Sequence, residues 1–372
     1  MILIKNVTVV SSKGRELRDV SLEGPDEVID GMGKFLLPGM VDPHVHFRDP
    51  GAPEKEDFAS GSAAALSGGV TTVLDMPNTN PATITVEALE AKRATANAKS
   101  AVHFGLFFGA TRDNLDEMRR AQNICGIKIY MGSSTGNLLL DDPAVWEEVF
   151  KIAKEKDVPV VVHAETESMI AAGKRDCECA RVATEAAIAL REKIGNRLHI
   201  AHLSCKAEVE LVRQHKHPLL SCEATLHHLL FTAADQKDAF LKMNPPLRSQ
   251  VDQDALWEGL KDGTIDCIAT DHAPHTVGEK QSANPPAGVP GVEFVFPLIL
   301  TAALQGRLTL EQVAALTSEN AARIFKLAPK DWVLVEPVQK TLAAADIRSK
   351  CGWSPYLEHQ ILAWPSRIFI QS

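Results

Sequence analysis

The chain lacks several features that would quickly assign it to a class. No stretch reaches the ~20 apolar residues that a membrane-spanning helix needs. The N-terminus, Met1–Lys5, does not open the long apolar core of a signal peptide. Basic residues are outnumbered, 39 Lys and Arg against 48 Asp and Glu, and the net charge is −9. This balance argues against nucleic acid or an anionic membrane as a partner. We therefore expect a cytoplasmic protein that acts on a small molecule.

Disulfide frameworks and nucleotide-binding loops are also missing from the sequence. The seven cysteines are odd in number and scattered, which predicts reduced thiols. The close pair in Cys177–Cys179 would diverge on a helix, so we expect two free thiols near solvent. No Gly-x-Gly-x-x-Gly or Walker loop occurs, which counts against dinucleotide and phosphoryl-transfer chemistry.

The chain does contain a repeated unit: a short apolar run, polar residues at its end, then a longer helical pattern such as Val86–Ser100 or Pro143–Lys156. The eight predicted strands are Leu36–His46, Val70–Met76, Val102–Phe108, Gly126–Tyr130, Val158–His163, Leu198–His202, Leu219–Ala224 and Ile265–Thr270. Alternating strands and helices imply a parallel sheet. Eight such units predict an α/β fold with a closed (β/α)8 TIM-type barrel over residues 41–330.

The two ends of the chain have a different pattern. Residues 1–40 contain a strand-like run at Ile2–Val10, and residues 331–372 contain others at Trp332–Val335 and Arg367–Ile370. We expect these ends to pair into a small β-rich accessory domain.

Polar residues follow the predicted barrel strands, where barrels of this kind carry their catalytic groups. His44 and His46 stand two apart in a strand, so both point to the same face. Further polar side chains at strand ends are Asn78, Lys128, His163, His202, Glu223 and Asp271. A satisfied core histidine is the commoner explanation for any single one, but so many polar groups together would be costly to bury unpaired. The set therefore predicts a binuclear metal site.

These residues resemble the amidohydrolase superfamily and, within it, the dihydroorotase family. The motifs that carry the resemblance are Asp42–Gly51, Asp75–Thr79, Lys242–Arg248, Ala269–His275, Pro286–Gly291 and Lys350–Pro355. The resemblance implies a zinc-dependent, reversible cyclisation of N-carbamoyl-L-aspartate to L-dihydroorotate in de novo pyrimidine biosynthesis.

The resemblance also implies roles for individual residues. One zinc would be held by His44, His46 and Asp271, and a second by His163 and His202. Lys128 would bridge the two as a carbamate formed with CO2, although some branches of the family use an aspartate there. Asp271 would act as general base and then as general acid.

Substrate contacts are implied in the same way. The ligands would be Arg48, Asn78, Asn244 and His275, with backbone near Ala287 and Gly288. Arg48 offers a planar fork for a carboxylate. The segment Gly132–Asn137, which contains Thr135, corresponds to the loop that closes over the substrate.

Two other functions remain open. A related cyclic amidase, such as an allantoinase or a hydantoinase (dihydropyrimidinase), would share the metals without needing the carboxylate contacts. A non-catalytic barrel that serves as a scaffold would be expected to lack metal ligands, whereas every ligand position here is filled. The sequence leaves open a homodimer, an association with aspartate carbamoyltransferase, and the roles of Glu223, His227 and His228.

Overall fold

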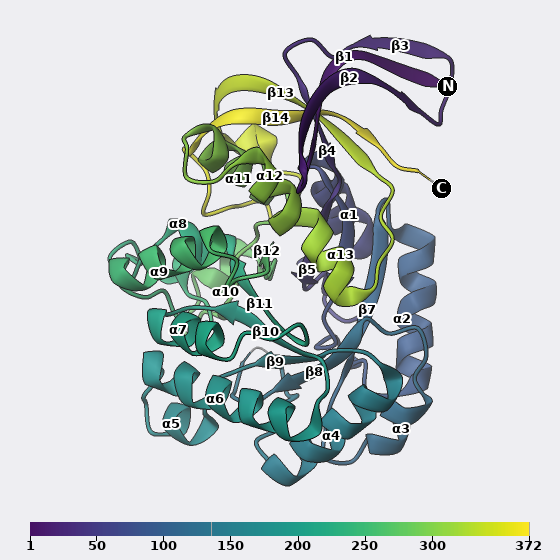
Figure 1. The fold of residues 1–372 in the computed structure, drawn as a ribbon. Helices are drawn as coiled ribbons and strands as arrows, with labels where there is room; N and C mark the ends of the chain where they lie inside the picture. The colour runs from purple at the N-terminus through teal and green to yellow at the C-terminus, as the bar shows by residue number, and fades with distance from the viewer. Residues whose placement is uncertain (135, 372) are drawn as a thin grey trace.

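The computed structural model describes residues 1–134 and 136–371, which form a barrel and a second sheet beside it (Figure 1). The barrel strands follow one another in chain order around an eight-stranded parallel sheet. They are β5 (Met40–Val45), β6 (Val70–Asp75), β7 (His103–Gly109), β8 (Gly126–Tyr130), β9 (Val160–His163), β10 (Leu198–Leu203), β11 (Leu220–Thr225) and β12 (Cys267–Ala269).

The barrel closes between its first and last strands. A parallel bridge joins Val45 to His272, and the His46 amide donates to the His272 carbonyl at 2.8 Å. Every residue of β6 and β10 is buried, as expected for parallel strands that are covered by helices. The predicted (β/α)8 barrel is confirmed.

Helices pack around the outside of the barrel (Figure 1). The principal ones are α1 (Phe58–Ser67), α2 (Val86–Lys99), α3 (Leu115–Arg120), α4 (Pro143–Lys156), α5 (Glu167–Ala171), α6 (Cys177–Ile194), α7 (Lys206–Gln214), α8 (Leu226–Leu230), α9 (Gln250–Lys261), α10 (Val277–Lys280), α11 (Val295–Leu304), α12 (Leu310–Ala314) and α13 (Asn320–Phe325). α4 begins where the sequence predicts, because Pro143 suits the first turn and the Asp142 side chain accepts from the Ala144 amide.

The second sheet joins the two ends of the chain, as the sequence predicts. Its strands are β1 (Ile2–Ser11), β2 (Gly14–Leu22), β3 (Glu27–Asp30), β4 (Phe35–Pro38), β13 (Trp332–Thr341) and β14 (Gln360–Phe369). Their order is β14-β13-β4-β1-β2, with β3 paired to β1. In the ribbon this sheet lies above the barrel, next to the flanking helices α11 and α12 (Figure 1). The division into domains of residues 1–40 with 331–372 and of 41–330 stays a proposal.

One predicted strand is divided. Leu36–His46 was expected as a single strand, but it forms β4 in the chain-end sheet and β5 in the barrel. The chain changes sheets at Gly39, whose amide donates to the Asp331 carbonyl at 2.9 Å. A side chain at Gly39 would collide with Thr71, so this crossing requires glycine.

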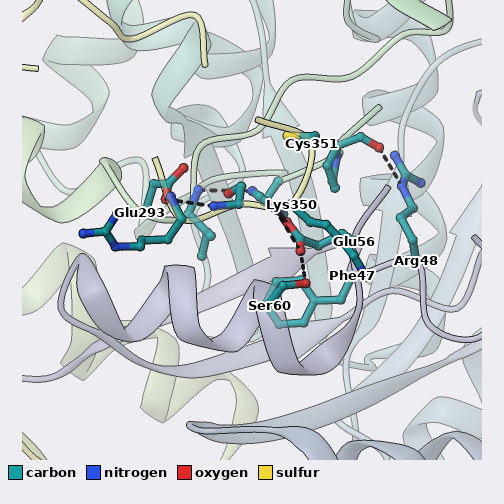
Figure 2. A network of polar contacts seen from close by, with 12 residues as sticks. Phe47, Arg48, Glu56, Ser60, Glu293, Lys350 and Cys351 are labelled. Carbon is teal, nitrogen blue, oxygen red and sulfur yellow. Dashed lines mark hydrogen bonds and ion pairs between the residues drawn. The ribbon is translucent and has the colours of Figure 1, made fainter. Parts of the chain in front are cut away.

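Two buried carboxylates fasten the segment between β13 and β14 to the barrel (Figure 2). Glu293 accepts from the backbone amides of Arg348 and Ser349 at 2.5 and 3.1 Å. Glu56 accepts from the Lys350 amide at 3.2 Å and also bonds the Ser60 hydroxyl. This attachment brings the C-terminal region to the mouth of the barrel.

Candidate functional site

A pocket lies at the C-terminal ends of the barrel strands. It is lined by His44, His46, Arg48, Asn78, Lys128, Tyr130, Ser134, His163, His202, Asn244, Asp271, Ala273, Ala287 and Gly288. All six predicted metal ligands and five predicted substrate contacts are therefore brought together. His275 stands behind Arg48, with Nε2 3.3 Å from Arg48 Nη2. The predicted contact Thr135 lies outside the described residues.

The pocket floor, as we call it, consists of His44, His46, Lys128, His163, His202 and Asp271. Asp271 Oδ1 lies 3.0 Å from His46 Nε2 and 3.5 Å from His44 Nε2. Ligand-type atoms of His44, His202 and Asp271 lie within 4.8 Å of one another. Nitrogens that face a carboxylate at these separations form a donor set that can hold a divalent metal ion.

A second group of donors stands beside the first. His163 Nδ1 and His202 Nε2 are 3.0 Å apart, and their rings meet edge to face. Lys128 Nζ is buried and has no hydrogen-bond partner within residues 1–134 and 136–371. Burial lowers the pKa of Lys128 to about 8, which raises the fraction of neutral amine at a given pH. A neutral amine is the form that reacts with CO2.

Burial also favours the neutral form of three floor histidines, His46, His163 and His202. It lowers the pKa of His46 to about 4 and shifts the pKa values of His163 and His202 downwards. Burial raises the pKa of Asp271, but its interactions with His44 and His46 outweigh that effect, and the pKa falls well below its usual range. Neutral imidazoles facing a carboxylate are the protonation states that a metal ion requires.

Further acceptors orient the histidines from behind. Glu223 Oε1 lies 2.6 Å from His44 Nδ1 and also accepts from the His202 amide at 3.2 Å. Glu165 Oε2 lies 2.8 Å from His163 Nε2. Such partners fix the ring orientation and the tautomer of a metal-binding histidine. Glu223, whose role the sequence left open, therefore contacts His44 and the His202 backbone. The sequence gave no sign of Glu165 except its place two residues after His163.

Three residues of the site have left-handed backbone although none is glycine. The φ angles are 59° at Arg48, 39° at His202 and 46° at Asp271. This region is sterically costly for residues that carry a Cβ. The surrounding structure therefore holds these side chains in positions that the free chain would avoid.

The pocket wall, as we call it, consists of Arg48, Asn78, Asn244, His275, Ala287 and Gly288. Arg48 Nε donates to the Pro274 carbonyl at 3.2 Å (Figure 2), and His275 Nε2 lies 3.1 Å from the Ala287 carbonyl. At Gly288 φ is 134°, and an added Cβ would lie 2.7 Å from the Ala273 carbonyl oxygen. The wall is therefore made of loops in close contact.

Two distant side chains hold this wall, and sequence reasoning missed both. Lys280 Nζ donates to the carbonyls of Lys242, Pro286 and Gly288 at 3.2, 3.1 and 2.9 Å. Trp353 Nε1 donates to the His275 carbonyl at 2.7 Å. No local sequence pattern predicts either contact, although Trp353 lies in the motif Lys350–Pro355. Ser134, which belongs to the predicted Gly132–Asn137 loop, also lines the pocket. Tyr130 lines it as well and was not predicted, and its place two residues after Lys128 was the available signal.

His227 and His228, whose roles the sequence left open, are both buried on α8. His228 contacts the Thr225 hydroxyl and the Pro245 carbonyl at 2.7 and 3.1 Å. His227 has no hydrogen-bond partner among the described residues. Neither lines the pocket.

None of the described helices is both long and apolar enough to span a membrane.

Comparison with known proteins agrees with this arrangement. The Amidohydrolase family model matches residues 35–330. A dihydroorotase from Halobacterium salinarum is 39% identical over 94% of this chain and 91% of its own length. The multifunctional protein CAD from Squalus acanthias is 40% identical over 88% of this chain, but the match spans 14% of that protein. The structure of an L-hydantoinase (dihydropyrimidinase) from Arthrobacter aurescens is 28% identical, covers 99% of this chain and 94% of its own, and has a TM-score of 0.92. The chain thus belongs to the amidohydrolase family and, within it, to the dihydroorotases.

Proposed function

We propose that the protein interconverts N-carbamoyl-L-aspartate and L-dihydroorotate as a zinc-dependent dihydroorotase of pyrimidine biosynthesis. The observation that carries the proposal is the convergence, in one pocket, of a metal-type donor set with Arg48 at its edge. The donors suit hydrolysis or closure of an amide, and the guanidinium suits a substrate that carries a carboxylate. The 39% identical dihydroorotase supports the same substrate.

The floor residues fit two zinc ions. His44, His46 and Asp271 would hold one ion, and His163 and His202 the other. A carbamate on Lys128 would bridge them, and the buried amine without a partner supports this role. When bound, the metal ions supply Lewis acidity for the carbonyl and generate a nucleophile from water at neutral pH.

The remaining chemistry belongs to this chain's own side chains. Asp271 Oδ1 faces the histidines, which leaves Oδ2 to accept a proton from attacking water and return it to the departing ring nitrogen. In the direction of ring closure, the same oxygen would take the proton from the carbamoyl nitrogen. Glu223 and Glu165 would keep the imidazoles aligned throughout.

The wall would select the substrate. Arg48 would pair with the ring carboxylate, and Asn78, Asn244 and His275 would add hydrogen bonds, with backbone at Ala287 and Gly288 closing the site. Thr135 and its loop would cover the bound molecule. A hydantoinase is the second candidate because the fold closely matches that of the L-hydantoinase. A hydantoin has no carboxylate, so the role of Arg48 separates the two.

Metal analysis and a paired assay test the proposal. Protein purified without chelator should contain about two zinc equivalents per chain and should hydrolyse dihydroorotate much faster than dihydrouracil. Equal rates on the two substrates would favour the hydantoinase. Full activity in metal-free protein would contradict both candidates.

The Lys128 bridge has its own test. Lys128→Ala should abolish turnover, and added short carboxylic acids with zinc should restore part of it by replacing the carbamate. The matched control is Lys151→Ala, because Lys151 bonds Glu148 on exposed helix surface. Native mass spectrometry of fully metallated, active protein should show the added mass of CO2 on Lys128. Its absence would contradict the bridge.

The partners and location of the protein belong to the same proposal. We infer a cytoplasmic enzyme, in a homodimer or associated with aspartate carbamoyltransferase, and the relative that is part of a multifunctional protein supports such an association. Light scattering of the purified chain, alone and with the transferase, would measure both associations.

A further inference from the structure

A pair of cysteines lies outside the pocket, where two helices of the barrel begin. Cys177 is the first residue of α6, and Cys205 is the N-cap of α7. Their sulfur atoms and a carboxylate oxygen of Asp252 lie within 4.8 Å of one another. Cys177 is partly exposed, as the sequence led us to expect. Cys179 is instead buried, with Sγ 3.6 Å from the Thr166 carbonyl, so that expectation was wrong for Cys179.

The two thiols differ in the way that an attacking and a resolving cysteine differ. Interaction with the Cys205 side chain, together with the charge of Arg248, lowers the pKa of Cys177 against the effects of burial and of the Asp252 and Glu208 carboxylates. The same coupling and burial raise the pKa of Cys205. The N-terminus of the long helix α6 adds positive potential at Cys177. A partly exposed thiol with a lowered pKa therefore stands beside a buried thiol.

Arg248 holds together the segments that carry the pair. Its guanidinium donates to the carbonyls of Arg175 and Asp176 at 2.7 and 3.2 Å and to the Ser204 hydroxyl at 3.3 Å. These three residues come just before Cys177 and Cys205 in the chain. The clamp limits how far the two sulfur atoms can separate.

Two carboxylates lie beside the pair, and both already serve as helix caps. Cys205 Sγ is 3.3 Å from Glu208 Oε2, which also accepts from the Ser204 and Cys205 amides at 3.0 and 3.2 Å. Cys177 Sγ is 3.9 Å from Asp252 Oδ1. Asp252 Oδ1 accepts from the Lys206 amide at 3.0 Å, and Oδ2 accepts from the Ser249 amide and hydroxyl at 3.1 and 2.6 Å. That carboxylate is therefore occupied as a helix cap. The Arg248 cation would also repel a metal ion, whereas it stabilises a thiolate.

We propose that Cys177 and Cys205 form a redox-active dithiol that hydroperoxides oxidise to a disulfide. The Cys177 thiolate attacks one peroxide oxygen, the O–O bond breaks, and a sulfenic acid and hydroxide form. Cys205 then attacks the Cys177 sulfur, the S–S bond forms, and the S–O bond breaks. The two protons of the thiols leave with the oxygens, so hydrogen peroxide becomes two waters while the thiols give up two electrons.

The pair is linked to the pocket through Arg175. Arg175 Nε lies 2.9 Å from Glu165 Oε2, which supports His163, and Nη2 donates to the Ser133 carbonyl at 2.7 Å. A disulfide formed two residues from Arg175 should therefore alter the loop that contains Ser133. This kinetic consequence rests on the proposed function, whereas formation of the disulfide does not.

Peptide mapping tests the proposal directly. Reduced protein is treated with hydrogen peroxide, its remaining thiols are alkylated, and the digest is analysed by mass spectrometry. We expect a Cys177–Cys205 linked peptide that dithiothreitol removes. Cys179→Ser is the matched control and should give the same linked peptide. Cys205→Ser should leave Cys177 as a sulfenic acid that dimedone traps.

Two results would overturn the proposal. One is a wild-type protein in which Cys177 stays reduced, or joins another cysteine, while peroxide consumes other thiols. The second is a metal ion bound by the two cysteines and Asp252. In that case wild-type protein purified without chelator would contain one metal equivalent per chain more than the Cys177→Ser variant. If the disulfide forms, KM for dihydroorotate should change in wild type and not in Cys177→Ser. If the protein has no such activity but the linked peptide appears, only the proposed function fails.

Discussion

The floor and the wall of the pocket are built in different ways. Floor residues such as His44, Lys128 and His163 stand on barrel strands, and buried carboxylates hold the imidazoles from behind. Wall residues such as Arg48 and Gly288 stand on loops, and distant side chains such as Lys280 hold them through backbone carbonyls. The floor would serve the hydrolysis of any amide, whereas the wall contains the cation that a particular substrate needs. On the proposed function, reaction type and substrate choice would thus be properties of separate structural layers.

Asp271→Asn should give the largest effect, because the proposed proton carrier and a ligand are both impaired. Loss of a positioned general acid–base group costs about 10²- to 10⁴-fold in rate, so kcat should fall by at least that much for every cyclic amide tested. Steady-state kinetics with metal analysis would measure it. Asp254→Asn on the exposed face of α9 is the control. A variant that keeps a tenth of wild-type kcat would remove Asp271 from the mechanism.

Arg48→Met should distinguish the wall from the floor. An unpaired substrate carboxylate in a shielded pocket costs about 2–4 kcal/mol, which corresponds to about 30- to 1,000-fold in kcat/KM for dihydroorotate. Zinc content should not change, and any activity on dihydrouracil should fall little. Arg93→Met is the control, because Arg93 bonds only surface groups such as the Gln122 carbonyl and Glu90. Equal losses on both substrates would show that Arg48 does not select for the carboxylate.

Lys280→Met tests whether a residue outside the pocket positions the wall. Three carbonyls would lose a charged donor, so we expect substrate binding to weaken by about 1–3 kcal/mol. This should appear mainly as a 5- to 150-fold higher KM, with kcat less affected. Lys261→Met is the matched control, because its exposed amine makes a 2.8 Å bond to Glu258 on the surface of α9. If kcat fell and KM did not change, the wall would have a catalytic role beyond binding.

His227→Met should give the smallest effect, on stability alone. Burial lowers the pKa of His227 to about 4, against ~6.5 in the unfolded chain. Between these pH values the unfolded chain binds the extra proton, so the free energy of unfolding falls as the pH drops from ~6.5 to 4. The variant should reduce that slope by up to about 1.4 kcal/mol per pH unit. Denaturant titrations of metal-free protein at several pH values would measure it, and an unchanged slope would show that His227 does not titrate in this way.

The same contrast explains what the sequence could predict. Lys128 lies inside the short strand β8 and His163 ends β9, and the order of strands in a parallel barrel brings such residues to one face. The contacts of Lys280 and Trp353 join segments far apart in the chain, and no local pattern encodes them. The break at Gly39 was missed because apolar residues continue on both sides, although the Pro38-Gly39 pair at the end of β4 is a local break signal.

The left-handed backbone of Arg48, His202 and Asp271 constrains how this protein can evolve. Strained positions of this kind cost on the order of 1–3 kcal/mol each, and glycine would relieve the cost at once. At these three positions, however, glycine would also delete the cation, the imidazole or the carboxylate. A lineage adapting to heat must therefore find its stabilising substitutions elsewhere, while one released from selection for turnover should lose these residues first.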